Sequence, residues 1–442
     1  MVVDTAGACR SGALDEGSEM ATLDYETLHA AVGGTAVGLR ARTALEPLGG
    51  PGDKVFPPTY GVDRTAATRY AIETRRIGGQ PVPSVVLSSV AAQANHMELV
   101  LLDAVRDGEL RLPLVSVDFS VHRATAGFDR ISSLEASHRI FDALLRDSLL
   151  GDRLFRLSDV GQKITEATNG NAAALYHYNP ATLLFGGWDS TGPKGGRGSK
   201  YERAITSEVV AMGIDRGVKT ASRIDAAGIE LKAGPLYLAE NQSLGEWTAD
   251  PAEAAVDKAG KPLLITGGGE GAAGRPSQVN HGNVTPSIDS LAGGVTADRI
   301  EAVTVVSFAA LRKLRFPLGT DGQSLQPLDR RRAAEAAART ALAALGVAAL
   351  TLLFERGFDL RSRCVLHACE EPQLELIGRA GQHDTVTVDR EGALALVDEA
   401  ERMASELGLT WAKDEILLQP TDRLVGLIER SRELSANEPA EG

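Results

Sequence analysis

The sequence predicts an α+β fold, because helical and strand patterns mix along it without the regular strand–helix repeat of a doubly wound sheet. The chain has 442 residues, of which 43% are apolar, so it can bury a sizeable core. Only 5% are aromatic, and we therefore expect a core of Ala, Val, Leu and Ile. No internal repeat and no clear linker interrupts the pattern.

The domain organisation follows from the strength of that pattern. Residues 1–60 are weakly patterned and punctuated by glycine, so we expect loops with short elements up to about residue 80. Residues 61–434 are expected to form a single domain with a helical C-terminal part. Residues 232–295 are rich in Gly, Pro, Asn and Ser and form a loop-rich insertion. The polar residues 435–442 are expected to be a disordered tail.

Hydrophobic periodicity predicts the elements in chain order. In the first half we expect a strand at 85–87, a helix at 89–106, a strand at 112–119, a helix from the capping box of Ser132 and Glu135 to Gly151, and a strand at 182–186. In the second half we expect strands at 303–307 and 360–368 and helices at 329–345 and 391–407. The segment 201–214 suits a helix or a strand. The apolar run 340–354 is shorter than the ~20 residues of a membrane span, so we expect a buried helix.

The net charge of −13 argues at face value against a nucleic-acid binder, but the charge is unevenly distributed. Residues 355–442 carry 19 acidic and 10 basic side chains. Residues 187–223 carry seven basic and four acidic ones, and residues 310–339 carry seven and three. Phosphate binding depends on the local field, so these two stretches stay candidates. The three cysteines fit a reducing cytoplasm, and we expect no signal peptide.

The most informative segment is 185–203, FGGWDSTGPKGGRGSKYER. Its glycines allow close approach of the backbone to a ligand, and Trp188 offers a surface for base stacking. Lys194, Arg197, Lys200 and Arg203 add positive charge, which suits a phosphate backbone. The segment is neither a Walker A loop nor a G-x-G-x-x-G fingerprint. A mobile surface loop with solvated charges explains the spacing equally well.

Two further segments carry binding groups. The segment 299–316 ends with Arg312, Lys313 and Arg315, although a solvated basic helix end explains them as well. The segment QVNHGNVTPS (278–287) offers Asn280 and His281 as donors and acceptors, although an ordinary turn has the same composition.

The sequence shows no convincing catalytic motif or metal-binding cluster. On a strand, Cys364 faces away from His367 and Cys369, so these three residues are not expected to bind one metal ion. His138 is expected to lie in the core. The sequence contains no G-x-S-x-G and no H-E-x-x-H motif.

Five blocks of sequence carry a resemblance to a known family. They read SLEASHRIFDALLRDS (133–148), LLFGGWDSTGPKGGRGSKYERAITSEVV (183–210), GVKTASRIDAAGI (217–229), VNHGNVTPSI (279–288) and GGVTADRIEAVTVVSFAALRKLRFP (293–317). They closely resemble the Cas-seven-type backbone subunit of type I-G CRISPR systems, formerly called type I-U. The resemblance covers about residues 60–380.

The resemblance implies a fold and a function. The family belongs to the RAMP superfamily, which has an RNA-recognition-motif-like (ferredoxin-like) core with large insertions. Several copies stack head to tail along a CRISPR guide RNA, with other subunits, in a Cascade complex. Each copy holds the sugar-phosphate backbone, and the bases pair with target DNA. A cytoplasmic, non-catalytic protein without a cofactor or a membrane partner is therefore expected.

The matching blocks also assign site residues. Lys194, Arg197, Lys200 and Arg203 are expected to contact RNA phosphates. The other candidates are Lys219 and Arg223 in GVKTASRID, then Arg312, Lys313 and Arg315, and lastly Asn280 and His281 as parts of a thumb-like loop. Two alternatives stay open: an RNA-cleaving relative that uses an acidic loop residue, and a nucleotide-binding enzyme that uses the glycine-rich loop.

Overall fold

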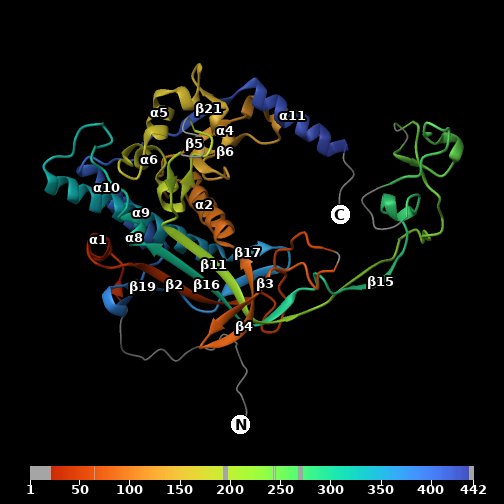
Figure 1. Ribbon diagram of the computed structural model, residues 1–442, viewed down its shortest axis with the longest axis horizontal. Coiled ribbons are helices and arrows are strands. Elements are labelled where there is room, and N and C mark those ends of the chain that lie inside the picture. The colour runs from red at the N-terminus through yellow and green to blue at the C-terminus, as the bar shows by residue number, and fades with distance from the viewer. Residues whose placement is uncertain are drawn as a thin grey trace, which may run out of the picture. The chain divides into compact units, whose positions relative to one another are not determined.

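A computed structural model describes residues 21–437 of the protein, apart from residues 64, 193–197, 242, 244 and 267–271. The chain forms two compact units (Figure 1). Unit 1 contains the described residues up to 60, residues 70–215 and residues 295–425. Unit 2 contains residues 61–69, 216–294 and the described residues from 426 on. Helices, antiparallel strand pairs and some parallel pairs all occur, which confirms the predicted α+β class.

Unit 1 is built on a ten-stranded sheet whose main path runs β1-β20-β19-β2-β16-β11-β4-β3, with the hairpin β17–β18 pairing to β2. The strands are β1 (Ala21–Thr22), β2 (Gly38–Pro47), β3 (Ile72–Ile77), β4 (Gln80–Ser88), β11 (Ile205–Arg216), β16 (Val295–Ser307), β17 (Phe358–Arg361), β18 (Cys364–Ala368), β19 (Gln373–Ile377) and β20 (His383–Thr387).

The central strands alternate between a buried and an accessible face. In β2, Leu39, Ala41 and Leu45 are buried, whereas Arg40 and Arg42 point to the other side. The neighbouring strand β16 has the same alternation, and its antiparallel register pairs Val305 with Arg40 and Val303 with Arg42. One face of the sheet therefore joins the core, and the other carries charged and half-buried apolar side chains.

The core of unit 1 is organised by the long helix α9 (Leu328–Arg356), which packs against α1 (Tyr25–Gly33), α2 (Val90–Arg106) and α10 (Arg390–Glu406). At Gly346 a side chain would meet Val306 of β16 and Ile205 of β11, so the missing side chain lets α9 lie close to the sheet. Helix α9 is long and apolar enough to cross a membrane, but 94% of its apolar window is buried inside the protein. We therefore treat it as a core helix.

A second sheet of unit 1 has five strands in the order β6-β5-β21-β7-β8. Its strands are β5 (Val115–Asp118), β6 (Arg130–Ser132), β7 (Ser148–Leu150), β8 (Arg153–Leu154) and β21 (Ile416–Pro420). The remaining elements of unit 1 are the hairpin β9 (Gly187–Trp188) and β10 (Lys200–Tyr201) and the short helices η1 (Ser120–His122), α3 (Arg123–Ala126), η2 (Arg139–Phe141), α4 (Ala143–Arg146), η3 (Phe155–Leu157), α5 (Asp159–Glu166), α6 (Ala173–Tyr178), α7 (Pro180–Phe185), α8 (Phe308–Leu311) and η8 (Arg379–Gly381).

Unit 2 contains the antiparallel ribbon of β12 (Lys219–Arg223) and β15 (Val284–Asp289) and the smaller pair of β13 (Tyr237–Leu238) and β14 (Trp247–Thr248). The short helices η6 (Pro251–Glu253) and η7 (Pro276–Val279) belong to it as well. Residues 232–294 of the predicted insertion lie in this unit. Helix α11 (Asp422–Asn437) starts in unit 1, and its residues from 426 on count with unit 2. Residues 435–437 are therefore helical, and the rest of the predicted tail lies outside the described residues.

Several predicted elements are confirmed and others are wrong. The helices expected at 89–106, 329–345 and 391–407 are α2, α9 and α10, and the segment 201–214 resolves as strand β11 with its short preceding strand β10. The strand expected at 182–186 is instead the buried helix α7, because Asn179 caps its first turn and Pro180 occupies its first position. Its apolar run could not distinguish a buried strand from a buried helix.

The helix expected from Ser132 is also absent. The capping box exists, since the Ser132 N–H donates to Glu135 Oε2 at 2.9 Å, but it closes a turn and not a helix. Arg139 then takes a left-handed backbone with φ of 53°, which stops helical propagation. His138 is exposed and is not a core residue.

Two other strand predictions need correction. The strand expected at 360–368 is the hairpin β17–β18, which turns at Arg363, a residue with φ of 60°. The expectation of only loops and short elements before residue 80 missed β2, which lies between β16 and β19 in the middle of the large sheet. Arg40, Arg42 and Glu46 on its accessible face mask the apolar pattern of its buried face.

Candidate nucleic-acid interface

The hairpin β9–β10 places an exposed aromatic ring beside a lysine. Trp188 and Lys200 are cross-strand partners, and the Lys200 Nζ lies 4.3 Å from the centroid of the indole ring. Trp188 is 45% exposed, although large aromatic side chains are mostly buried. Such a pair, which we call the Trp188–Lys200 platform, can stack on a base and attract its phosphate at the same time.

The loop between these strands is closed at its base by Asp189. The Asp189 carboxylate is buried, and its Oδ1 atom lies 2.7 Å from Arg156 Nη2. The backbone N–H of Asp189 donates to the Ser199 carbonyl at 3.2 Å. Gly198 passes so close that a side chain there would lie 1.9 Å from the Asp189 carbonyl oxygen. The acidic residue of the WDSTG block is therefore engaged in holding the loop. Lys194 and Arg197, two of the predicted phosphate contacts, lie outside the described residues.

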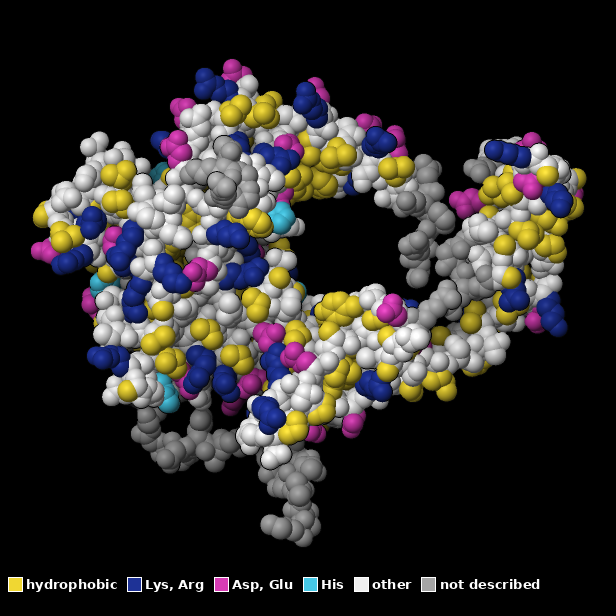
Figure 2. Space-filling model, in the orientation of Figure 1, with side chains coloured by type: hydrophobic (Ala, Val, Ile, Leu, Met, Phe, Trp, Pro, Cys, Tyr) yellow, Lys and Arg dark blue, Asp and Glu magenta, His cyan; other side chains and the backbone are white. Residues whose placement is uncertain are grey.

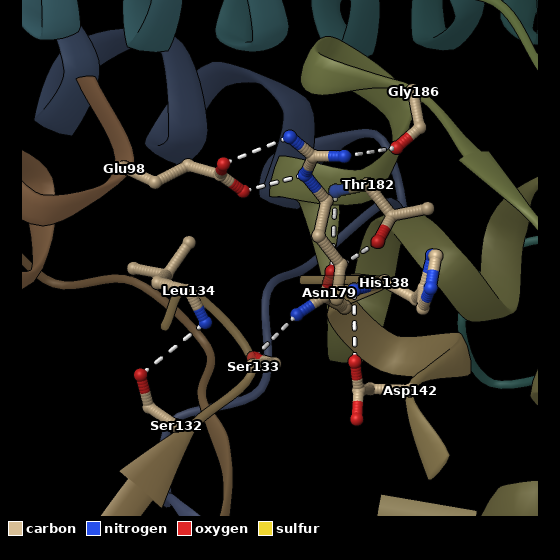
Figure 3. A network of polar contacts seen from close by, with 10 residues as sticks. Glu98, Ser132, Ser133, Leu134, His138, Asp142, Asn179, Thr182 and Gly186 are labelled. Atoms are coloured by element: carbon tan, nitrogen blue, oxygen red, sulfur yellow. Dashed lines mark hydrogen bonds and ion pairs between the residues drawn. The ribbon is translucent and has the colours of Figure 1, made fainter. Parts of the chain in front are cut away.

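A buried ion pair holds the residue that directly precedes the hairpin (Figure 3). Arg139 donates to both carboxylate oxygens of Glu98 at 2.5 and 2.8 Å and to the Gly186 carbonyl at 3.0 Å. Glu98 comes from the middle of α2, and Gly186 ends α7 directly before β9. Burial raises the pKa of Glu98, and the Arg139 guanidinium opposes that shift. The pair thus ties helix α2 to the start of the hairpin.

Neighbouring residues complete this buried layer. Asn179 donates to Ser133 Oγ at 2.8 Å and accepts from the backbone and hydroxyl of Thr182 (Figure 3). The ring of Tyr201 on β10 stacks on Phe141 at 6.3 Å. The blocks 133–148 and 183–210 therefore meet around the hairpin. Sequence reasoning singled out both blocks but missed Glu98, because a single glutamate on a helix gives no local sign of a distant partner.

The structure brings the second predicted basic group next to this hairpin. Asn169 donates to the Lys200 carbonyl at 3.3 Å and accepts from the Arg315 N–H at 2.8 Å. Lys313 Nζ lies 2.7 Å from Glu202 Oε1, which follows Tyr201. We call the surface formed by Lys200, Arg203, Lys313 and Arg315 the basic ridge. Figure 2 shows Lys and Arg side chains gathered on this side of unit 1, over α8, α9 and the start of β11.

The residues of the ridge differ in their partners. The Arg203 side chain is exposed and makes no hydrogen bond or ion pair within the described part of the chain, although its charge acts to lower the pKa of Glu98. Arg315 shares the buried Glu335 with Arg339, at 3.1 and 2.9 Å. Burial raises the pKa of Glu335, but the N–H of Phe316 and the two guanidiniums outweigh it, so the net shift is downward.

Arg312 is not part of the ridge. Its guanidinium donates to the carbonyls of Ala31, Val32 and Ala36 at 2.6 to 3.2 Å. These carbonyls lie at and just beyond the C-terminus of α1, so Arg312 caps that helix.

The other predicted residues lie in unit 2. Lys219 pairs with Asp289 across the ribbon at 3.1 Å, and Arg223 donates to the carbonyls of His281 and Gly282. Asn280 is exposed with a left-handed backbone, and the His281 ring packs edge-on against Trp247, whose exposed indole sequence reasoning missed. Arg223, Asn280 and His281 therefore lie together, at the end of the ribbon.

The accessible face of the large sheet carries a second set of arginines. Four of them have glutamates within 4.0 Å: Arg40 with Glu375, Arg42 and Arg299 with Glu301, and Arg75 with Glu73 and Glu208. Between them lies a shallow hollow of about 300 Å³, lined by Val210, Met212, Val303 and Val305 among others. Within the described residues, no group of three His, Cys, Asp or Glu side chains is placed to hold a metal ion.

A comparison with known protein families agrees with the nucleic-acid interface that the geometry indicates. Residues 39–216 match the model of a family described as CRISPR-associated protein GSU0053. Over these residues the chain is therefore similar to a CRISPR-associated protein family. It runs from β2 to the end of β11 and contains the Trp188–Lys200 platform, Arg203 and the Glu98–Arg139 pair. No curated protein matches the chain. The family match supports a role in CRISPR defence.

Proposed function

We propose that this protein is a non-catalytic RNA-binding backbone subunit of a type I-G Cascade complex. Several copies would stack head to tail along one CRISPR guide RNA in the cytoplasm and contact the other Cascade subunits. Target DNA would bind through base pairing with the guide. The observation that carries the proposal is the basic ridge beside the exposed Trp188–Lys200 platform, in a segment of a CRISPR-associated family.

The chemistry of the ridge supports a grip on the RNA backbone. Cations without internal partners attract phosphates along any sequence, whereas reading of bases requires side chains that reach base edges. Lys200 and Arg203, for which no carboxylate lies within 4.0 Å among the described residues, supply these cations, and Trp188 supplies a ring that stacks on any base. A subunit that delegates sequence reading to base pairing needs only these contacts.

The order of elements in unit 1 supports the RNA-recognition-motif-like core that the resemblance implies. The chain order β2, α2, β11, β16, α9, β19 follows a βαββαβ succession, with β3 and β4 added before α2. In the sheet, these four strands lie in the order β19-β2-β16-β11. Along the chain, α2 and α9 each lie between two strands of this one sheet, as a ferredoxin-like core requires.

The first test is co-purification. The full chain is expressed with a CRISPR array and the neighbouring genes, and the particles are separated by size. A large particle with uniform guide RNA and several copies of this chain per RNA is the expected result. A small particle free of nucleic acid would contradict the proposal and favour a nucleotide-binding enzyme. Regularly spaced cuts in matched RNA with Mg²⁺ would instead favour an RNA-cleaving subunit.

The second test addresses the ridge itself. Lys200→Ala and Arg203→Ala are compared in RNA-binding titrations at several salt concentrations. Each variant is expected to lower the slope of log K against log salt by about 0.7, the value for one phosphate contact on a single strand. Arg402→Ala is the matched control, because Arg402 is exposed on α10 and pairs with Glu399 and Glu406. Unchanged slopes for both ridge variants would remove this surface from the RNA site.

A further inference from the structure

Helix α9 begins with three consecutive arginines, Arg330, Arg331 and Arg332. The N-terminus of a helix carries partial positive charge, so cations in the first turn work against helix stability. The capping position is Pro327, which provides no side-chain hydrogen bond to the first turn. The stability of α9 therefore does not account for this run.

Only one of the three arginines has a carboxylate partner within the described chain. Arg332 lies 3.6 Å from Asp329, the acidic residue of the first turn. Arg330 is exposed, and none of the described carboxylates pairs with it. Arg331 is partly buried, and its Nε is buried without an acceptor. A buried N–H without a partner is rare in proteins, and a bound anion would supply the missing acceptor.

The position of Arg331 connects it to the basic ridge. Arg331 and Glu335 are four residues apart and so lie on the same side of α9. Glu335 already accepts hydrogen bonds from Arg315, Arg339 and the Phe316 N–H. One carboxylate thus faces the guanidiniums of both Arg315 and Arg339, so these three side chains together keep a positive charge. The pKa of Arg339 is lowered, first by burial and further by Arg315 and Arg312.

We infer that Arg330 and Arg331, together with the neighbouring Arg315, bind a phosphate of the guide RNA and so extend the basic ridge to the start of α9. Guanidinium groups suit this ligand, because their planar N–H groups match two phosphate oxygens. The inference rests on the proposed function and adds the direction in which the RNA backbone runs, from the Trp188–Lys200 platform past Arg315 to the first turn of α9.

The test compares two substitutions in the same helical turn of the full chain. Arg331→Gln is expected to weaken binding of single-stranded RNA several-fold and to lower the salt slope by about 0.7. Arg332→Gln is the control, since it removes the same charge from an arginine that already has a partner, and its slope is expected to stay near that of the wild type. Thermal unfolding of both variants is expected to match the wild type.

The outcomes separate this inference from the proposed function. Loss of slope in Lys200→Ala but not in Arg331→Gln would overturn the inference and leave RNA binding by the platform intact. Failure of the wild-type chain and of its assembled complex to hold RNA would overturn the proposed function. A third arm adds inorganic phosphate at constant ionic strength. Phosphate that binds the RNA-loaded wild type without displacing RNA, and does not bind the RNA-loaded Arg331→Gln variant, would assign the site to a free anion and contradict the RNA track.

Discussion

Two surfaces of unit 1 carry arginine and lysine side chains, and they differ in how those charges are partnered. On the accessible face of the large sheet, glutamates lie within 4.0 Å of Arg40, Arg42, Arg75 and Arg299. On the basic ridge, Lys313 and Arg315 also have glutamate partners, but Arg203 has none within 4.0 Å among the described residues, and Lys200 lies over an aromatic ring. The sheet face is close to neutral over short distances, whereas the ridge retains a positive field.

The difference shows why the net charge of −13 is a poor guide to nucleic-acid binding. A cation within 4.0 Å of a carboxylate contributes little field a few ångströms away, and salt screens the remainder. An unpaired cation acts at full strength on a phosphate that approaches it. The relevant quantity is therefore the number of unpartnered cations on one surface, and the following variants test this view.

The largest expected effect comes from the buried pair beneath the ridge. Arg139→Ala would leave Glu98 charged and buried without its partner, so we expect a loss of about 3–5 kcal/mol in the free energy of unfolding. Urea denaturation measures this loss. The double variant Glu98→Gln with Arg139→Met removes both charges and is expected to recover much of it. Equal losses in the single and double variants would show that packing, and not the ion pair, supports the hairpin.

A smaller effect is expected from the aromatic part of the platform. Trp188→Ala removes a stacking surface but no charge, so RNA binding should weaken by about 1–3 kcal/mol while the salt slope stays the same. Titrations at two salt concentrations distinguish this result from loss of a phosphate contact. Trp188→Phe keeps a ring and should retain part of the affinity. Full affinity in Trp188→Ala would exclude stacking at this position.

The smallest effect is expected on the sheet face. Arg40 and its partner Glu375 are partly exposed, and such pairs contribute about 0–1 kcal/mol to stability. Arg40→Ala should therefore change neither the unfolding midpoint by more than a few degrees nor the salt slope of RNA binding. A slope lowered as much as in Lys200→Ala would mean that RNA crosses the sheet face, and the contrast between the two surfaces would fail.

The sequence predicted elements whose signal is local. Helices α2, α9 and α10 follow from apolar residues at helical spacing, and their predicted bounds lie within a few residues of the observed ones except at the C-terminal end of α9. Helix α7 was mistaken for a strand because six buried residues leave no polar face to reveal the period. Strand β2 was missed because tertiary pairing, and not its own composition, places it in the centre of the sheet.

The candidate site was predictable only in part for the same reason. The glycine-rich segment revealed Trp188, Lys200 and Arg203 through composition and through the resemblance. The use of Arg312 as a cap on α1 depends on carbonyls about 280 residues earlier in the chain, which no local pattern indicates. The partner of Arg139 lies 41 residues earlier on another helix. Contacts between distant segments decide which arginines remain available for a ligand.

The closure of the glycine-rich loop at its base has a consequence for engineering. The bond from Asp189 to Ser199 and the ion pair to Arg156 anchor both ends of the segment between them. Apart from Gly198, where a side chain would meet the Asp189 carbonyl oxygen, we expect that the length and charge of this segment can be varied while Trp188 and Lys200 keep their places in the hairpin. The affinity for RNA and the geometry of the hairpin could then be changed separately. This loop is therefore a suitable place to attach a reporter group or to alter the affinity.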